Sequence, residues 1–191
     1  MNAVIRTVIA VLIVQILIAA GFIYSGLFNV AATDPHWSVT HAIMETARVR
    51  SIRVHAAAIR PPSDLTDHKR IVGGTSHFAE HCSSCHSAPG VEPGEMAKGM
   101  YPSPPVLTNA AKQWTSGELF WIIRNGIKMS GMSAWPGHSD NEIWDIVAFL
   151  SKLPNMSEQD YGNLVKESLD AGGHKAHSED CAPQHRAAGH C

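Results

Sequence analysis

The chain has 191 residues, of which 45% are hydrophobic and 17% charged, with 15 Lys and Arg against 17 Asp and Glu. This length suits one domain of about 100 residues with extensions and is too short for two full enzyme domains. The formal net charge of −2 gives no basic field for phosphates, so we predict no nucleic-acid partner. Twelve histidines and four cysteines are the unusual features of the composition.

The amino-terminal segment is apolar and long enough to cross a membrane. Residues 7–24 read TVIAVLIVQILIAAGFIY, and Gln15 is their only strongly polar side chain. About 20 helical residues, rising about 1.5 Å each, cross a hydrocarbon core of about 30 Å. We predict an uncleaved signal-anchor, a single transmembrane helix, within residues 1–33. Cleavage after Val30-Ala31-Ala32 remains the alternative.

Charges around this segment predict its orientation. Arg6 favours a cytoplasmic amino end, and the first arginine after the segment, Arg48, lies at the edge of the range over which charges steer insertion. The sequence therefore predicts a single-pass protein of the bacterial inner membrane, with the rest of the chain on the periplasmic side.

Residues 34–62 are predicted to form a helical connector. Asp34-Pro35 is typical of a helix cap followed by a proline in the first turn, residues 36–60 contain no Gly or Pro, and Pro61-Pro62 ends the segment. Apolar and basic positions do not separate into stripes at helical spacing. A helix lying on the membrane surface and a connector that packs on a partner both remain open.

The most specific motif is Cys82-Ser83-Ser84-Cys85-His86. Cysteines at this spacing lie on one helical turn, where both can bond the vinyl groups of one haem, and the adjacent histidine can bind the iron. A zinc site would need a second ligand pair, and Cys181 and Cys191 lie about 100 residues away. A redox dithiol would need a strand before its helix, and little of the chain alternates like a strand. We predict one covalent haem c on Cys82 and Cys85, with His86 as an axial ligand.

The second axial ligand is predicted in a Gly-rich loop. Residues 126–135 read GIKMSGMSAW and follow a short apolar helix predicted over residues 116–125. The loop offers two methionines, Met129 and Met132. A thioether ligand raises the reduction potential of a haem relative to a second histidine.

Residues flanking the haem motif follow a known pattern. Gly74 and Phe78 precede Cys82 by eight and four residues, and a helix that starts with a capping box is predicted over residues 139–150. In these features residues 70–154 resemble class I cytochrome c domains, specifically the membrane-anchored monohaem kind. The resemblance implies an all-α class I cytochrome c fold around one covalent haem, in which Phe149 packs across Gly74.

The resemblance also implies roles for residues around the haem. Pro105-Val106-Leu107 resembles the family's Pro-x-Leu segment, in which the proline carbonyl holds the histidine and the leucine lines the haem edge. Residues 131–135, Gly-Met-Ser-Ala-Trp, resemble the family's ligand loop and select Met132 over Met129. Ser133 replaces the usual proline, so the loop is less stiff. Trp135 is expected beside the haem or as core filling, and Tyr101 is a candidate for bonding a propionate.

The remaining ring side chains are expected to be structural. His77, His81 and His138 are predicted at the surface or satisfied by neighbours, with replacement of Met132 by one of them as the alternative. Three aromatic residues near the short apolar helix are predicted in the core: Trp114, Phe120 and Trp121. Residues 87–106 contain three glycines and five prolines and are expected to wrap the haem edge without regular structure.

The carboxyl-terminal region loses its apolar periodicity. We predict a haem domain over residues 63–157 and a disordered polar tail over residues 158–191, with a short helix at residues 160–169. Metal binding by the tail is a hypothesis, and a disulfide between its two cysteines is the alternative. The candidate tail ligands for copper, zinc or nickel are His174, His177, Cys181, His185, His190 and Cys191.

These features predict an electron carrier rather than an enzyme. We predict a membrane-anchored c-type cytochrome that moves single electrons in a respiratory or dehydrogenase-linked chain. Its expected partners are a dehydrogenase as donor and an oxidase or another cytochrome as acceptor. Two alternatives remain: a haem protein that binds ligands or acts as a peroxidase through a labile sixth ligand, and a metal-handling protein that acts through its tail. The sequence shows no phosphate-binding loop, no nucleophile beside a base and no second haem motif.

Overall fold

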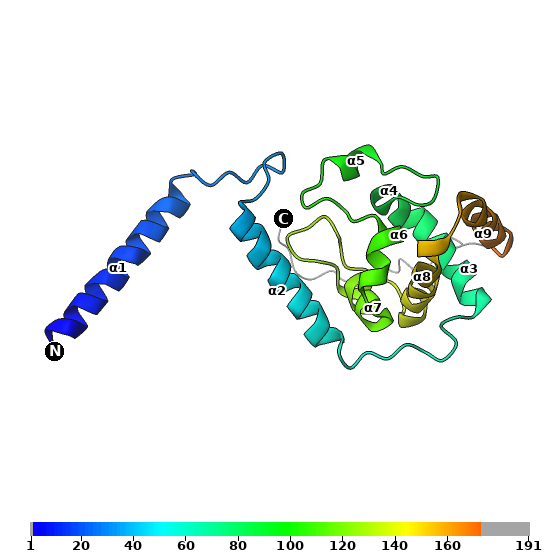
Figure 1. Cartoon of the computed structure of the whole chain (residues 1–191), viewed down its shortest axis with the longest axis horizontal. Helices are drawn as coiled ribbons and strands as arrows, with labels where there is room; N and C mark the ends of the chain where they lie inside the picture. The colour runs from blue at the N-terminus through cyan, green and yellow to red at the C-terminus, as the bar shows by residue number, and fades with distance from the viewer. Residues whose placement is uncertain (1, 173–191) are drawn as a thin grey trace, which may run out of the picture. The chain divides into compact units, whose positions relative to one another are not determined.

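The computed structural model describes residues 2–172, and these residues form helices and loops without a β-strand (Figure 1). The chain divides into two compact units, Met1–His36 and Trp37–Cys191. The all-α fold predicted from the sequence is confirmed.

Helix α1 (Ala3–Tyr24) is the regular part of the amino-terminal unit. Its 22 residues rise about 33 Å at about 1.5 Å each, which matches a hydrocarbon core of about 30 Å. None of its side chains is buried, and within residues 2–172 it is the one helix long and apolar enough to cross a membrane. The helix ends just before Gly26, whose φ of 70° suits a residue without a side chain.

Helix α2 (Ser38–Ala56) begins later than predicted. Trp37 precedes its first turn, whereas the side chain of Asp34, the expected cap, accepts a hydrogen bond from the side-chain amide of Asn29. Asp34 therefore belongs to the turn before the helix, and its prediction as a helix cap is wrong.

Helix α2 packs against helix α7 (Ser116–Asn125) within the second unit. Ile52 and Ala56 are buried, and a Cβ atom on Gly117 would lie 2.7 Å from the carbonyl oxygen of Ile59. The connector is therefore part of the same compact unit as the helices that follow it. The sequence left open a helix on the membrane surface and a connector that packs on a partner. Neither of these described a contact within the same chain.

Helix α3 (His68–His77) leads directly into the two segments that carry the haem motif, the π-helical turn η1 (Phe78–Cys82) and α4 (Ser83–His86). The side chain of Asp67 accepts a hydrogen bond from the backbone N–H of Lys69 and so caps the start of α3. A π-helical turn widens one turn of the helix and is frequent at functional sites. Here that turn ends at the first cysteine of the motif.

Helix α8 (Asp140–Lys152) crosses α3 at Gly74. A Cβ atom on Gly74 would lie 1.9 Å from the carbonyl oxygen of Asp145, so only glycine permits this approach. The resemblance implied that the ring of Phe149 packs across Gly74. The closest contact to Gly74 is instead the backbone of α8. Phe149 lies one turn further along and contacts Phe78, with ring centroids 4.8 Å apart. The capping box predicted at the start of α8 is present.

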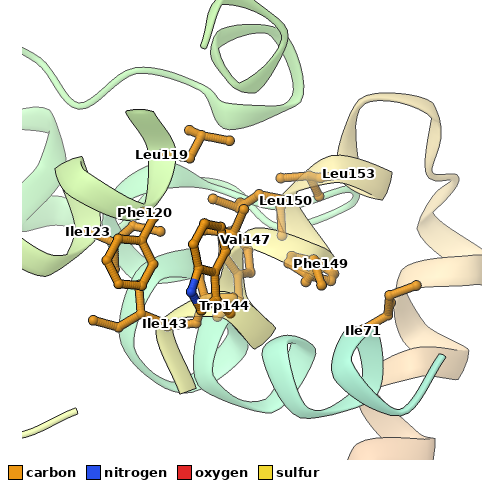
Figure 2. Packing of buried hydrophobic residues seen from close by; sticks show 14 of the residues in the cluster. Ile71, Leu119, Phe120, Ile123, Ile143, Trp144, Val147, Phe149, Leu150 and Leu153 are labelled. Carbon is orange, nitrogen blue, oxygen red and sulfur yellow. The ribbon is translucent and has the colours of Figure 1, made fainter. Parts of the chain in front are cut away.

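The core lies between α3, α7 and α8, whose apolar side chains point toward one another (Figure 2). Phe120 of α7 stacks on Trp144 of α8, with ring centroids 4.4 Å apart. Three aromatic residues were predicted in the core. Phe120 is buried there, and Trp114 is half-buried and packs against the hydrophobic core. Trp121 instead faces α2, where its ring lies 5.6 Å from that of His55.

The segment between α4 and α7 has little regular structure. Residues 87–106 contain the short turn α5 (Glu95–Lys98), which was not predicted, and an isolated bridge between Ala88 and Val91. Two further short turns follow, α6 (Leu107–Ala110) and the 3₁₀ turn η2 (Ala111–Gln113).

Helix α9 (Glu158–Asp170) follows the 3₁₀ turn η3 (Leu153–Asn155) and packs against α3. Tyr161 is only 6% exposed, and its ring lies 6.5 Å from that of Phe78. The helix predicted at residues 160–169 is present. The prediction of disorder from residue 158 is wrong for residues 158–170, because α9 covers the core. The six candidate tail ligands lie outside the described residues: His174, His177, Cys181, His185, His190 and Cys191.

Candidate haem-binding site

The two cysteines of the motif lie on one continuous helical stretch. Cys82 is the last residue of η1, and Cys85 lies in α4. Both side chains are half-buried, and neither forms a disulfide. The hydroxyl of Ser83 donates a hydrogen bond to the carbonyl oxygen of Ala79, 2.8 Å away, which ties α4 to the turn before it. The spacing of the motif is therefore held by a helix, as covalent attachment to one haem requires.

The ring of His86 is oriented by the backbone of a distant loop. Its Nδ1 atom lies 2.8 Å from the carbonyl oxygen of Pro105. Because a carbonyl only accepts hydrogen bonds, Nδ1 carries the proton and Nε2 keeps its lone pair. A histidine that ligates haem iron needs that lone pair, and the carbonyl fixes the orientation of the ring. The contact between His86 and Pro105 that the resemblance implied is present.

The Cys82 thiol is poorly suited to chemistry as a free thiolate. Burial, and to a lesser extent the neighbouring Cys85, raises the pKa of Cys82 to about 12. A redox dithiol needs a thiolate at neutral pH, which reactive cysteines reach through a lowered pKa. This environment opposes the dithiol alternative to haem attachment.

The two methionines of the Gly-rich loop occupy different environments. Met129 is 80% exposed and has a positive φ of 58°. Met132 is half-buried and packs against the hydrophobic core. A side chain held against the core is the better placed of the two to act as an internal ligand.

Hydrogen bonds fix the backbone of Met132. Its carbonyl oxygen accepts from the N–H of Ile127 at 3.0 Å, and its own N–H donates to the hydroxyl of Ser130 at 3.2 Å. Gly126 lets the returning chain approach, since a Cβ atom there would lie 2.7 Å from the carbonyl oxygen of Met132. Backbone contacts thus restrain a loop in which Ser133 replaces the family's proline.

Three further predicted pocket residues are half-buried. Leu107 starts α6, and both Leu107 and Trp135 pack at the edge of the hydrophobic core. Trp135 also contacts two histidine rings, those of His81 and His138, at centroid distances of 5.2 and 5.1 Å. Tyr101 is half-buried in the loop before Pro105.

Comparison with known proteins agrees with this geometry. Residues 70–150 match the family model described as cytochrome c oxidase, cbb3-type, subunit III. This span contains the haem motif, the Pro-x-Leu segment, the methionine loop and the α3–α8 crossing. The chain carries a class I c-type cytochrome domain.

A solved structure similar to this cytochrome is cytochrome cL from the marine methylotrophic bacterium Methylophaga aminisulfidivorans MPT. The two share 23% sequence identity with a TM-score of 0.38, over 66% of this chain and 83% of that chain. No curated protein matches the sequence.

The residues of the cytochrome domain fit a covalent haem c. Two thiols on one helical stretch suit thioether bonds to the haem, a histidine with an available Nε2 lone pair could ligate the iron, and a core-packed methionine thioether could supply a second ligand. The residues that would hold the group are Cys82, Cys85, His86 and Met132.

Sequence reasoning missed one feature next to this site. His77, His81 and His138 were expected as separate surface or satisfied residues, but the structure brings their rings together. His77 is also only 3% exposed, not a surface residue. The spacing of four between His77 and His81 was the one available signal, because it places two side chains on the same helix face.

Proposed function

We propose that this cytochrome is a membrane-anchored electron carrier with one haem c, bonded to Cys82 and Cys85 and ligated by His86 and Met132. A cytochrome c domain implies haem-based electron transfer, since the iron of a bound haem c alternates between ferric and ferrous states. The observation that carries the proposed ligand set is the 2.8 Å contact between His86 Nδ1 and the Pro105 carbonyl, directly beside the cysteine pair.

The protein contributes by holding both axial side chains in place. The carbonyl of Pro105 orients His86, and two backbone hydrogen bonds restrain Met132. A domain that supplies two axial ligands leaves no open coordination position, which favours electron transfer over ligand binding or peroxidase chemistry. We further propose that Leu107 and Trp135 exclude water from the haem edge and that Tyr101 bonds a propionate.

A redox titration of the haem-loaded protein tests this function. We expect one haem per chain, a single one-electron transition, and reduced protein that does not bind carbon monoxide readily. The variant Met132→Ala should open a coordination position and bind carbon monoxide, whereas Met129→Ala should behave like the wild type. Ready carbon monoxide binding by the reduced wild type would instead support the ligand-binding alternative.

We also propose that α1 anchors the cytochrome in the bacterial inner membrane, with the haem domain in the periplasm. The length and apolar surface of α1 support a span, and Arg6 supports a cytoplasmic amino end. Protease added to spheroplasts should degrade the haem domain while the cytoplasm stays protected. Protection of the haem domain would contradict this orientation.

The proposed partners are membrane-bound or periplasmic redox proteins, with a dehydrogenase as donor and an oxidase or another cytochrome as acceptor in a respiratory chain. Anchoring raises the effective concentration of such partners by confining both to one membrane. Because α2 belongs to the second unit, a protease site that releases this unit intact belongs within residues 29–36. Cleavage there should slow reduction by membrane donors, and unchanged kinetics would contradict a role for tethering. Co-purification from membranes should identify the partners themselves.

A further inference from the structure

Three histidines from three segments meet at one place. His77 ends α3, His81 lies in η1, and His138 lies in the loop just before α8. Each offers one ring nitrogen, and these three nitrogens lie within 4.8 Å of one another. His77 is buried, His138 is half-buried and His81 is exposed, so the group reaches from the core to the surface. We call these three residues the histidine cluster.

The rings of the histidine cluster are packed closely but do not stack in parallel. Their centroids lie 5.1 Å apart for His77 and His138, 5.9 Å for His81 and His138, and 6.3 Å for His77 and His81. The interplanar angles are 56°, 86° and 41°. Trp135 packs against two of the rings and forms an apolar wall. Protonated imidazoles this close would repel one another, whereas one cation could accept a lone pair from each.

The spacing of the nitrogens is near that of a three-histidine metal site. Zinc binds imidazole nitrogen at about 2.0–2.1 Å in tetrahedral geometry, which separates the ligand nitrogens by about 3.3 Å. The nitrogens of the cluster therefore need to approach by about 1.5 Å at most. Rotation of His81, the exposed member, shortens its two nitrogen–nitrogen distances without disturbing the core, and His138, which is half-buried in a loop, can shift toward His77.

The charged groups around the histidine cluster favour a cation. Glu142 of α8 places Oε1 4.0 Å from His77 Nε2, and Glu80 of η1 places Oε2 3.8 Å from His81 Nε2. From α7, Arg124 approaches the backbone of His138, but its charge is paired with Asp140 at 3.3 Å. Two carboxylates face the rings, and a carboxylate beside a ligating histidine strengthens metal binding.

We propose that the histidine cluster binds one divalent transition-metal ion of the borderline class, with Zn²⁺ as the probe. The three imidazoles supply three ligands, and water or Glu142 Oε1 completes the tetrahedron. This site is separate from the residues proposed to hold the haem and from the candidate ligands of the tail. A bound ion would join α3, η1 and the loop before α8, and so would stabilise the fold.

Zn²⁺ titration of the haem-loaded, full-length protein tests the site by calorimetry. Two backgrounds are compared: the wild type, and a 191-residue variant with the tail ligands removed by His→Ala and Cys→Ser substitutions. In each background, His81→Gln and His138→Gln should lose one equivalent of Zn²⁺. The matched control His68→Gln changes an exposed histidine that pairs with Glu167 and should keep the full stoichiometry.

Two further readouts separate a metal site from a structural role. Zn²⁺ should raise the unfolding temperature of the tail-substituted protein and leave that of its His81→Gln version unchanged. Glu142→Gln keeps a side chain able to cap α8 but removes the charge, and should weaken Zn²⁺ binding about tenfold. The proposal would be overturned if the tail-substituted protein and its His81→Gln version bound the same number of Zn²⁺ ions. It would also be overturned if Zn²⁺ bound only to the tail. An unchanged haem spectrum in each variant shows that the domain has folded.

Discussion

The two sides of the proposed haem site are held in different ways. On the histidine side, His86 belongs to a continuous helical stretch that is packed under α8 and is oriented by the carbonyl of Pro105. On the methionine side, Met132 belongs to a loop and is restrained by hydrogen bonds within that loop. The histidine side therefore depends on helix packing, whereas the methionine side depends on contact with the edge of the core and on local hydrogen bonds, one of which comes from the Ser130 side chain.

The largest effect is expected from a substitution that disrupts the packing of α3 against α8 on the histidine side. Gly74→Ala would place a Cβ atom 1.9 Å from the Asp145 carbonyl oxygen, so α3 and α8 must separate. We expect a loss of about 3 kcal/mol or more in the free energy of unfolding. Urea unfolding of the haem-loaded protein measures it.

The neighbouring glycine provides a matched control for this substitution. Gly73→Ala would meet only the carboxylate of Asp145, at 3.2 Å, and a side chain can move aside. Its cost should be well below that of Gly74→Ala. Equal costs would show that backbone contact at the crossing is not what the fold requires.

A smaller effect is expected from the methionine side. Ser130→Ala removes the hydroxyl that accepts from Met132 N–H and donates to the carbonyl oxygen of Ile127 at 2.8 Å. We expect a loss of about 1–2 kcal/mol in stability and a faster association of carbon monoxide with the reduced protein. Ser151→Ala removes a hydroxyl of α8 far from the loop in sequence and should change neither rate nor ligation. Unchanged carbon monoxide kinetics in Ser130→Ala would mean that Met132 is held by something else.

The smallest expected effect concerns the start of α8, just after the methionine loop. Burial raises the pKa of Glu142, but hydrogen bonds from Ser139 and the charges of His77 and His138 outweigh it, and the net pKa is lowered from 4.5. The unfolded chain therefore binds this proton more tightly than the folded one, so the stability that Glu142 contributes is complete above about pH 4.5 and is lost as pH falls through the lowered pKa.

The Glu142→Gln variant measures that contribution. It should be less stable than the wild type by about 0.5 kcal/mol at pH 7, because it loses a negative charge at a helix amino end. The difference should shrink below pH 4.5. Denaturant unfolding at pH 7 and pH 3.5 checks both values, and a difference that grows on acidification would contradict the sign.

Much of the histidine side was predictable from sequence, because its signals are local or family-specific. The Cys-x-x-Cys-His spacing, the capping box at Ser139 and the Pro-x-Leu segment all lie where expected. Helix α7 has the bounds predicted for it, since Thr115 and Glu118 cap its start and Gly126 ends it.

The parts that sequence did not predict are contacts between distant segments. Tyr161, Leu164 and Val165 recur at helical spacing and pack on the core, but three apolar positions in a mostly polar segment did not mark α9 as part of the domain. Ile52 and Ala56 are likewise too few to mark a buried face on α2. The histidine cluster joins His138 to two residues far earlier in the chain, and only the fold brings them together.

Met132 would be the second residue, with His86, that holds the haem iron. The most direct test is the weak red absorption band that arises from thioether coordination to ferric haem. We expect the oxidised wild type and Met129→Ala to show this band and Met132→Ala to lack it. A wild type without the band, or a band that survives Met132→Ala and disappears in Met129→Ala, would contradict ligation by Met132.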